Sequence, residues 1–206
     1  GGDVYFRVKK FNKYGYLSKQ PIDQLESGAR IEVGDQKEDP LDFALWKKDE
    51  KFGYKSPWGV GRPGWHIECS AMSMKYLGEN FDIHTGGIDH IPIHHTNEIA
   101  QSEGATGKKW VNYWLHNEFL VIAKEKNEEG KETQAKMSKS SGNFLTLQKL
   151  IDEGYAPLDY RFLLLGGHYR SQITFSWPAM DGAKNSRKAL NQRIAKILEK
   201  TDFAKN

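Results

Sequence analysis

His94 and Glu98 stand four residues apart in a stretch predicted to be helical, so their side chains project from one face. An imidazole and a carboxylate in that arrangement can hold one zinc ion, and Cys69, the only cysteine, could add a thiolate from the preceding predicted helix. Three ligands with an open position are typical of a catalytic or substrate-binding zinc. The alternatives are an i,i+4 hydrogen bond on a solvated face, with Cys69 a packed apolar group or a nucleophile.

Residues 81–89 read Phe-Asp-Ile-His-Thr-Gly-Gly-Ile-Asp, a predicted strand followed by a glycine turn and an acid. Gly86 and Gly87 would let a ligand approach the backbone closely, because glycine has no side chain. Asp89, just beyond the carboxyl end of the strand, could accept hydrogen bonds from ribose hydroxyls, as in dinucleotide-binding folds. The alternative is a plain turn in which Asp89 caps a helix.

Residues 136–140 read Lys-Met-Ser-Lys-Ser, and Ser-Gly-Asn follows. Two lysines, small hydroxyls and a glycine make a flexible cationic loop. Such a loop can close on a triphosphate and neutralise the charge that develops on departing pyrophosphate. By composition alone the segment is only a polar loop.

The elements that would position these residues alternate between strands and helices. A helix is expected over residues 65–77, ended by Gly78, and another over residues 94–103, ended by Gly104. The strands and turns expected around them are a strand at residues 80–83, a turn at 84–87, strands at 110–115 and 118–123, and an exposed hairpin or mobile loop at 124–135. This alternation favours an α/β architecture.

The flanking segments differ in character. Residues 1–56 are expected to be β-rich and turn-rich, with strands at residues 4–8 and 29–33 and a short helix opened by Asp39 and Pro40. Residues 57–63 are expected to form a rigid, glycine-punctuated loop. Beyond Thr146 the pattern is mainly helical, with one apolar helix stripe formed by Leu190, Ile194, Ile197 and Leu198.

Composition is that of a soluble globular protein, with 38% hydrophobic and 28% charged residues among 206. A net charge of +3 proves no nucleic-acid partner, although residues 184–206 carry seven Lys/Arg against two acids. A polyanion could dock there, or the charges form a solvated helix face. The apolar runs at residues 119–123 and 162–165 are far shorter than the roughly 20 residues of a membrane span. No signal peptide is recognisable, so the cytoplasm is expected.

The chain resembles class I cysteinyl-tRNA synthetases over nearly its whole length and in the family's order. Residues 136–140 match the nucleotide-loop signature of class I enzymes. The other matching segments are residues 2–6, 42–47, 64–72, 81–89, 94–98, 114–117 and 142–144. The resemblance implies the second half of a Rossmann-like catalytic domain, with part of the connective insertion before it and a helical segment after it. Residues 1–56 would be part of the β-rich insertion, 57–135 the second half of the nucleotide-binding fold with the zinc and adenylate site residues, and 136–206 the nucleotide loop and a helical stem-contact-like region.

The resemblance also implies a reaction. Cysteine would be activated with ATP and Mg²⁺ to cysteinyl-adenylate and passed to its cognate tRNA. Cys69, His94 and Glu98 would hold one zinc ion per subunit, and the substrate's own sulfur would fill the open position. Serine differs from cysteine by one atom, and ordinary pocket contacts discriminate poorly at that level. Zinc prefers thiolate, so the metal itself could distinguish sulfur from oxygen.

Other site roles follow from the same resemblance. Trp65 and His84 would line the amino-acid pocket, although Trp65 could also be a core residue. Lys136 and Lys139, chiefly Lys139, would grip the phosphates during catalysis. The residues expected around adenosine are Gly86, Gly87 and Asp89 at the ribose and His116 and Asn117 near the adenine, with a satisfied core histidine as the alternative for His116.

Two features of the family are absent from the 206 residues: a His-x-Gly-His motif and a second cysteine that would serve as the fourth zinc ligand. We therefore expect a fragment that lacks the N-terminal part of the catalytic domain and has little or no aminoacylation activity by itself. Loss of the first strands of a parallel sheet exposes an edge. The chain is thus expected to self-associate or to pair with the missing part.

Two other functions are compatible with these residues. A ligase that activates cysteine and passes it to an amino sugar, as in mycothiol synthesis, shares the zinc and adenylate sites. A synthetase-like module that binds nucleotide, metal or RNA without catalysis is the second alternative.

Overall fold

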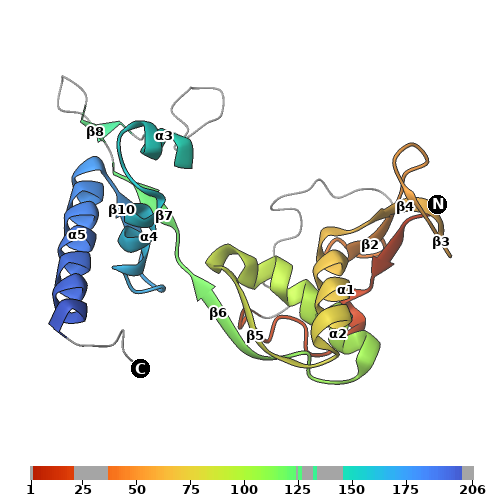
Figure 1. Ribbon diagram of the computed structural model, residues 1–206. Coiled ribbons are helices and arrows are strands. Elements are labelled where there is room, and N and C mark those ends of the chain that lie inside the picture. Colours follow the sequence, from red (N-terminus) through yellow and green to blue (C-terminus); the bar gives the residue numbers. More distant parts are fainter. Residues whose placement is uncertain (1, 21–36, 124, 127–131, 134–145, 201–206) are drawn as a thin grey trace. The chain divides into compact units, whose positions relative to one another are not determined.

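The computed structural model describes residues 2–20, 37–123, 125–126, 132–133 and 146–200. The chain forms two compact units, Gly1–His116 and Asn117–Asn206 (Figure 1). Both units mix strands and helices, which confirms the predicted α/β class. The boundaries predicted after residues 56 and 135 separate functional regions of the family, whereas the boundary after His116 separates two compact units. The predicted boundaries therefore stay predictions. None of the described helices is long and apolar enough to cross a membrane.

The first unit begins with an antiparallel sheet. Its strands, in spatial order, are β1 (Val4–Phe6), β2 (Phe43–Lys48), β4 (Gly59–Pro63) and β3 (Tyr54–Ser56). A 3-10 turn, η1 (Val8–Lys10), follows β1. Phe6 lies opposite Phe43, and their rings stack with centroids 5.0 Å apart. Val8, Phe43 and Ala100 form one buried cluster, which joins the sheet to the second helix of the unit.

Two predictions for this region are wrong. Asp39 and Pro40 form a single turn instead of a helix: the Asp42 N–H donates to the Asp39 carbonyl at 3.0 Å, and β2 then begins at Phe43. Gly59–Pro63 is a strand instead of a loop. Its glycine serves close packing, because a Cβ at Gly61 would come within 2.4 Å of Trp46 Nε1. The strand predicted at residues 29–33 lies outside the described residues.

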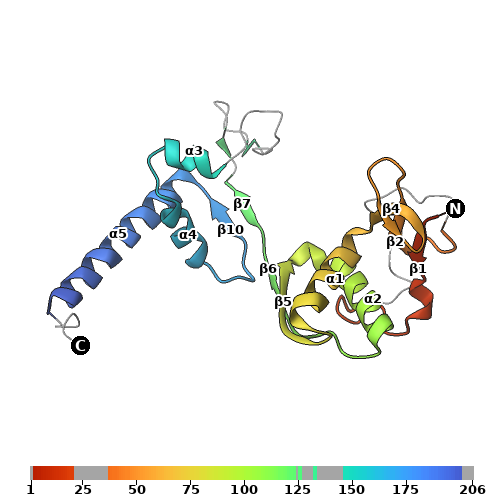
Figure 2. The same cartoon turned by 45° about the vertical axis from the view of Figure 1, so that its right-hand side comes forward.

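Helix α1 (Trp65–Leu77) has the predicted bounds. It ends because Gly78 adopts φ 88° and its N–H donates to the Met74 carbonyl at 3.1 Å. Small side chains let α1 approach the second helix: Ser102 Oγ donates to Ser70 Oγ at 2.8 Å, and both residues are buried. The two helices lie side by side in both views (Figures 1 and 2).

The second helix, α2 (Thr96–Thr106), begins two residues later and ends three residues later than predicted, so His94 precedes it. A π-helical turn, η4 (Ile91–His95), leads into it, and Thr96 Oγ1 donates to the Ile91 carbonyl at 2.7 Å. The predicted end at Gly104 is wrong, because Gly104 lies inside the helix with the Phe6 ring 3.4 Å from where its Cβ would be. Gly107, with φ 68°, ends the helix instead.

Strand β5 (Phe81–Gly87) follows α1 in the sequence and pairs with β6 (Val111–Asn117), which follows α2. The turn predicted at residues 84–87 is wrong, because the strand continues to Gly87 and a 3-10 turn, η3 (Ile88–His90), follows. Phe81, Ile99, Trp110 and Val111 form the buried apolar cluster beneath this pair.

The second unit is built on a short parallel pair, β7 (Leu120–Ile122) and β10 (Ile173–Phe175). Its helices are α3 (Leu147–Asp152), α4 (Pro157–Leu165) and α5 (Trp177–Lys200). Strands β8 (Glu125–Lys126) and β9 (Glu132–Thr133) pair antiparallel, which confirms the hairpin alternative. Helix α5 carries the predicted apolar stripe, whose four side chains are 44%, 45%, 59% and 58% exposed in sequence order.

Candidate functional site

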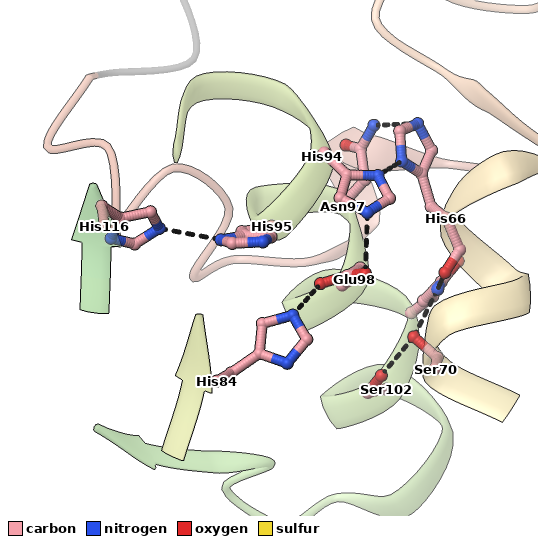
Figure 3. A network of polar contacts seen from close by, with 10 residues as sticks. His66, Ser70, His84, His94, His95, Asn97, Glu98, Ser102 and His116 are labelled. Atoms are coloured by element: carbon pink, nitrogen blue, oxygen red, sulfur yellow. Dashed lines mark hydrogen bonds and ion pairs between the residues drawn. The ribbon is translucent and has the colours of Figure 1, made fainter. Parts of the chain in front are cut away.

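Six of the seven histidines gather in the first unit, where α1, β5, the η3–η4 turns and β6 meet. Figure 3 labels all of them except His90. Ring contacts link them in one cluster, whose members are His66, His84, His90, His94, His95 and His116. Beside them, every residue from His94 to Ser102 is buried, and most of these are polar. Buried polar groups need partners, so this stretch is built for interactions rather than for apolar packing.

Glu98 lies at the centre of the cluster and its side chain is 0% exposed. One oxygen is 3.0 Å from His94 Nε2, and the other is 3.0 Å from His84 Nε2. Burial alone would raise the pKa of Glu98, but contacts with the imidazoles of His84 and His94 outweigh it and hold the pKa at about 2. The carboxylate is therefore ionised at neutral pH inside a water-poor site.

The predicted metal ligands converge. Ligand atoms of Cys69, His94 and Glu98 all lie within 4.8 Å of one another. The predicted zinc fits this donor set, because thiolate, imidazole and carboxylate are its usual ligands. Both oxygens of Glu98 are buried, and two imidazoles lie at ion-pair distance from them. Among the described residues, however, no donor makes a hydrogen bond of good geometry to either oxygen, so the carboxylate can still accept a cation. Glu98 also lies within the same range of His84 and His95.

Without a cation, the Cys69 thiol is held in its protonated form. Burial raises its pKa to about 11, and the negative charge of Glu98 acts in the same direction. A divalent cation between these two side chains would reverse that balance, because a coordinating thiol is deprotonated. The electrostatics of Cys69 and Glu98 therefore suit a divalent cation.

Three contacts that the sequence did not predict extend the site behind His94. Nδ1 of His94 lies 2.8 Å from Nδ1 of His66, and Nε2 of His66 lies 3.1 Å from the Asn97 amide nitrogen. The Tyr14 hydroxyl donates to the Asn97 amide oxygen. Burial lowers the pKa of His66 to about 4, so its imidazole is neutral at pH 7.

His95 and His116 form a second pair, with His95 Nδ1 2.8 Å from His116 Nε2. Burial lowers the pKa of His95 to about 3, and burial followed by the nearby His84 lowers that of His116. His116 is thus a member of the cluster with a histidine partner. Its predicted place near adenine stays a prediction.

Trp65, predicted to line the amino-acid pocket, contacts one of the proposed metal ligands, His94. Its ring stacks on His94 with centroids 4.2 Å apart and planes inclined by 26°. The side chain is 53% exposed, so the alternative of a core residue does not describe it. His84, the other predicted pocket residue, contacts Glu98 directly.

The predicted nucleotide residues lie at several places. Gly86 and Gly87 end β5, and Asp89 lies in η3. Gly86 is packed against histidine rings, since a Cβ there would come within 2.5 Å of His95 Cε1. Asn117, the last residue of β6, is exposed and belongs to the second unit. Lys136 and Lys139 lie outside the described residues.

Sequence reasoning missed His66, His90, His95 and Asn97. Three of them carried a signal, because each stands three residues from a proposed ligand: His66 precedes Cys69, His95 precedes Glu98, and Asn97 follows His94. Helical residues three apart share a face, so the spacing indicated a polar neighbour for each of these ligands.

Comparison with known proteins places this geometry in context. Residues 1–185 match the family model described as tRNA synthetases class I (C) catalytic domain. The chain is 61% identical over 204 residues to a cysteine–tRNA ligase of Treponema denticola, covering 97% of this chain and 39% of that protein. It is 53% identical over 199 residues to one of Shouchella clausii, covering 96% and 40%. The chain thus spans about two fifths of the length of these relatives.

Proposed function

This chain belongs to the family of class I (C) tRNA synthetase catalytic domains, and from that membership we propose that it supplies part of the active centre of a cysteine–tRNA ligase. The membership confirms the expected family and places the observed strands and helices in a class I catalytic domain of Rossmann-like type. ATP, used with Mg²⁺, is the nucleotide substrate of this class. Cysteine and its tRNA are the proposed co-substrates, and the cytoplasm is the expected location.

One observation carries the proposal: Cys69, His94 and Glu98 converge within 4.8 Å in a chain whose relatives are named for cysteine. These three side chains would hold one zinc ion. When bound, zinc would supply a preference for thiolate over hydroxyl, which is the distinction that cysteine and serine require.

The surrounding residues would prepare this site for an amino acid. Glu98 keeps its negative charge, because contacts with two imidazoles hold its pKa low. Trp65 stacks on His94 yet leaves half of its ring surface open, so it can limit water and contact a small substrate. His84 would face the same substrate from β5 while it contacts Glu98.

The nucleotide would lie beyond the amino acid. In this proposal Gly86, Gly87 and Asp89 contact the ribose, and the adenine lies near His116 and Asn117. Lys136 and Lys139 neutralise the phosphates as pyrophosphate departs. Support for these roles comes from the residue types and the family membership.

The function is tested in a chimera in which this chain replaces the matching segment of the Treponema denticola relative. We expect cysteine-dependent exchange of pyrophosphate into ATP and charging of cysteine tRNA, with serine at least 10³-fold less effective. Lys139→Ala should lower the exchange by about 10² or more, in the range of lost transition-state charge stabilisation. Exchange with another amino acid would contradict the proposal, and transfer to an amino sugar would favour the mycothiol-type ligase.

The 206-residue chain alone provides a second test. We propose that it binds zinc and has little or no exchange activity, because it spans about two fifths of its relatives. We also propose that it associates, with itself or with the rest of such a protein. A folded chimera without exchange activity would favour the non-catalytic module, and a monomer in sedimentation at high concentration would contradict self-association.

A further inference from the structure

The nitrogen of His94 that faces away from Glu98 is held by a hydrogen-bond chain of partly buried polar side chains. Nε2 of His94 is 3.0 Å from Glu98, so Nε2 is the atom available to a metal there. Nδ1 is 2.8 Å from His66 Nδ1, and His66 Nε2 is 3.1 Å from the Asn97 amide nitrogen. The Tyr14 hydroxyl donates to the amide oxygen of Asn97. Figure 3 shows His94, His66 and Asn97 with their contacts.

The orientation of the Asn97 amide in this structure sets the direction of the hydrogen-bond chain. The amide nitrogen can only donate, so His66 Nε2 accepts and the single proton of neutral His66 is on Nδ1. His66 Nδ1–H therefore donates to His94 Nδ1, and the proton of His94 is on Nε2, facing Glu98. In this direction His94 offers no lone pair to a metal.

A metal on His94 Nε2 requires the opposite direction. The proton of His94 must then be on Nδ1, where it donates to His66 Nδ1, and His66 must carry its own proton on Nε2. Every later link can follow, because an Asn amide presents either its oxygen or its nitrogen and a Tyr hydroxyl either donates or accepts. All the hydrogen bonds are kept, and only their direction changes.

We infer that His66, backed by Asn97 and Tyr14, is a positioning residue that presents Nε2 of His94 to a metal, and that metal binding reverses this hydrogen-bond chain. The inference rests on the proposed metal site. An outer partner of this kind fixes the tautomer and orientation of a metal-binding histidine, and its loss typically weakens metal affinity about 10- to 100-fold.

The surroundings of His66 suit a fixed partner. Gln101 Nε2 donates to the His66 carbonyl at 2.6 Å, which ties this turn of α1 to α2. The edge of the Phe43 ring meets the imidazole with centroids 5.4 Å apart and planes at 89°. Asn97 is 3% exposed, so water does not compete for its amide.

The tautomers themselves can be observed. In the 206-residue chain labelled with ¹⁵N-histidine, long-range ¹H–¹⁵N spectra distinguish Nδ1–H from Nε2–H, and single substitutions assign the signals. We expect His94 to change from Nε2–H to Nδ1–H on addition of one equivalent of zinc, and His66 to change from Nδ1–H to Nε2–H. If zinc binds while His66 keeps its proton on Nδ1, the inference is overturned and the metal site stands.

Metal affinity provides the second readout, measured by competition with a chromophoric chelator. His66→Phe keeps a planar ring without polar atoms and should weaken zinc binding about 10- to 100-fold. His66→Asn should restore part of that loss, because its amide can reach the position of Nδ1. Tyr14→Phe should weaken binding by a smaller factor. Tyr16→Phe, the same change at a side chain that is 46% exposed, is the control and should have no effect.

Cobalt separates the failure of the two proposals. A thiolate-to-Co²⁺ charge-transfer band that is lost in Cys69→Ser shows that the metal is bound through Cys69. Its absence from the unsubstituted chain would overturn the metal site and this inference together. A normal band with unchanged affinity in folded His66→Phe would overturn the role of His66 alone.

Discussion

Gly86 lies so close to His95 that a Cβ on Gly86 would come within 2.5 Å of the Cε1 atom of the imidazole. The same Cβ would be 2.8 Å from Nδ1 of His90. The glycine is thus required by the histidine cluster itself, whether or not a nucleotide also approaches the backbone there. This relationship makes the cluster sensitive to a single methyl group.

We expect Gly86→Ala to destabilise the first unit by about 1 to 3 kcal/mol, which is the usual cost of overpacking a well-filled site. His95 would have to move away and would lose its contact with His116, now at 2.8 Å. Urea unfolding followed by circular dichroism measures the change. Gly182→Ala is the control, because a Cβ at Gly182 in α5 meets no heavy atom within 4 Å. That variant should be more stable by about 0.5 to 1 kcal/mol, and a loss of stability there would contradict this interpretation.

Cys69 should react slowly with iodoacetamide in metal-free protein. Burial and then the charge of Glu98 raise its pKa from 9.0 to about 11, so the thiolate fraction at pH 8 is about 100-fold lower than for an ordinary thiol. The rate should rise with pH up to about 11. Glu98→Gln removes the repelling charge and should accelerate the reaction at pH 8. Equal rates in native protein and in urea would contradict the raised pKa.

Part of this site could be predicted from the sequence, because helical spacing alone puts His94 and Glu98 on one face. Helix α1 could also be predicted, since a left-handed Gly78 ends it where the apolar pattern stops. The turn predicted at Gly86 and Gly87 is wrong, because glycine is found equally well in a turn and at a close approach between two parts of a protein. The contact with His95 shows that Gly86 serves a close approach.

The rest of the site depends on contacts that sequence spacing does not encode. Asn97 and Tyr14 are 83 residues apart, yet they share a hydrogen bond. His95 ends the π-helical turn Ile91–His95 and meets His116 of β6 at 2.8 Å, although the two residues are 21 positions apart. Long-range packing, which also brings Cys69 of α1 to His94 and Glu98, therefore completes a site in which only the His94–Glu98 pair follows a local pattern.

The stability of the metal-free protein should fall between pH 6.5 and about 3. Burial lowers the pKa of His95 from 6.5 to about 3 and that of His66 to about 4. Below pH 6.5 the unfolded chain thus binds more protons than the folded chain, so the free energy of unfolding rises with pH in this window. In His95→Phe the slope between pH 4 and 6 should be smaller by about 1.4 kcal/mol per pH unit, which is one proton's contribution. Above pH 7.5 the two slopes should coincide, and an unchanged slope at pH 4 to 6 would contradict the prediction.

The ion pair of Asp159 and Arg187 should stabilise the second unit. Asp159 is 1% exposed: its Oδ1 accepts from Arg187 Nε at 2.6 Å, and its Oδ2 accepts from the Ala156 N–H at 2.8 Å where α4 begins. Arg187→Ala would leave a buried carboxylate without its cation. We expect a loss of about 2 to 3 kcal/mol, below the value for a fully buried pair because the Arg187 side chain is 25% exposed.

Hydrogen exchange of α4 and α5 amides measures this loss without interference from the first unit. Lys188→Ala, an exposed neighbour on α5, should change stability by no more than about 0.5 kcal/mol. Burial raises the pKa of Asp159, but the hydrogen bonds from Arg187 and from the Ala156 N–H lower it by more than burial raises it. The pKa of Asp159 is therefore below its ordinary value of 3.8. The stabilisation is therefore present above about pH 4 and is lost as the pH falls through the folded pKa, so the difference between Arg187→Ala and the unsubstituted chain should narrow in acid. Equal protection of α4 in the Arg187 and Lys188 variants at pH 7 would show that the pair contributes nothing, and that the carboxylate is held by the helix terminus alone.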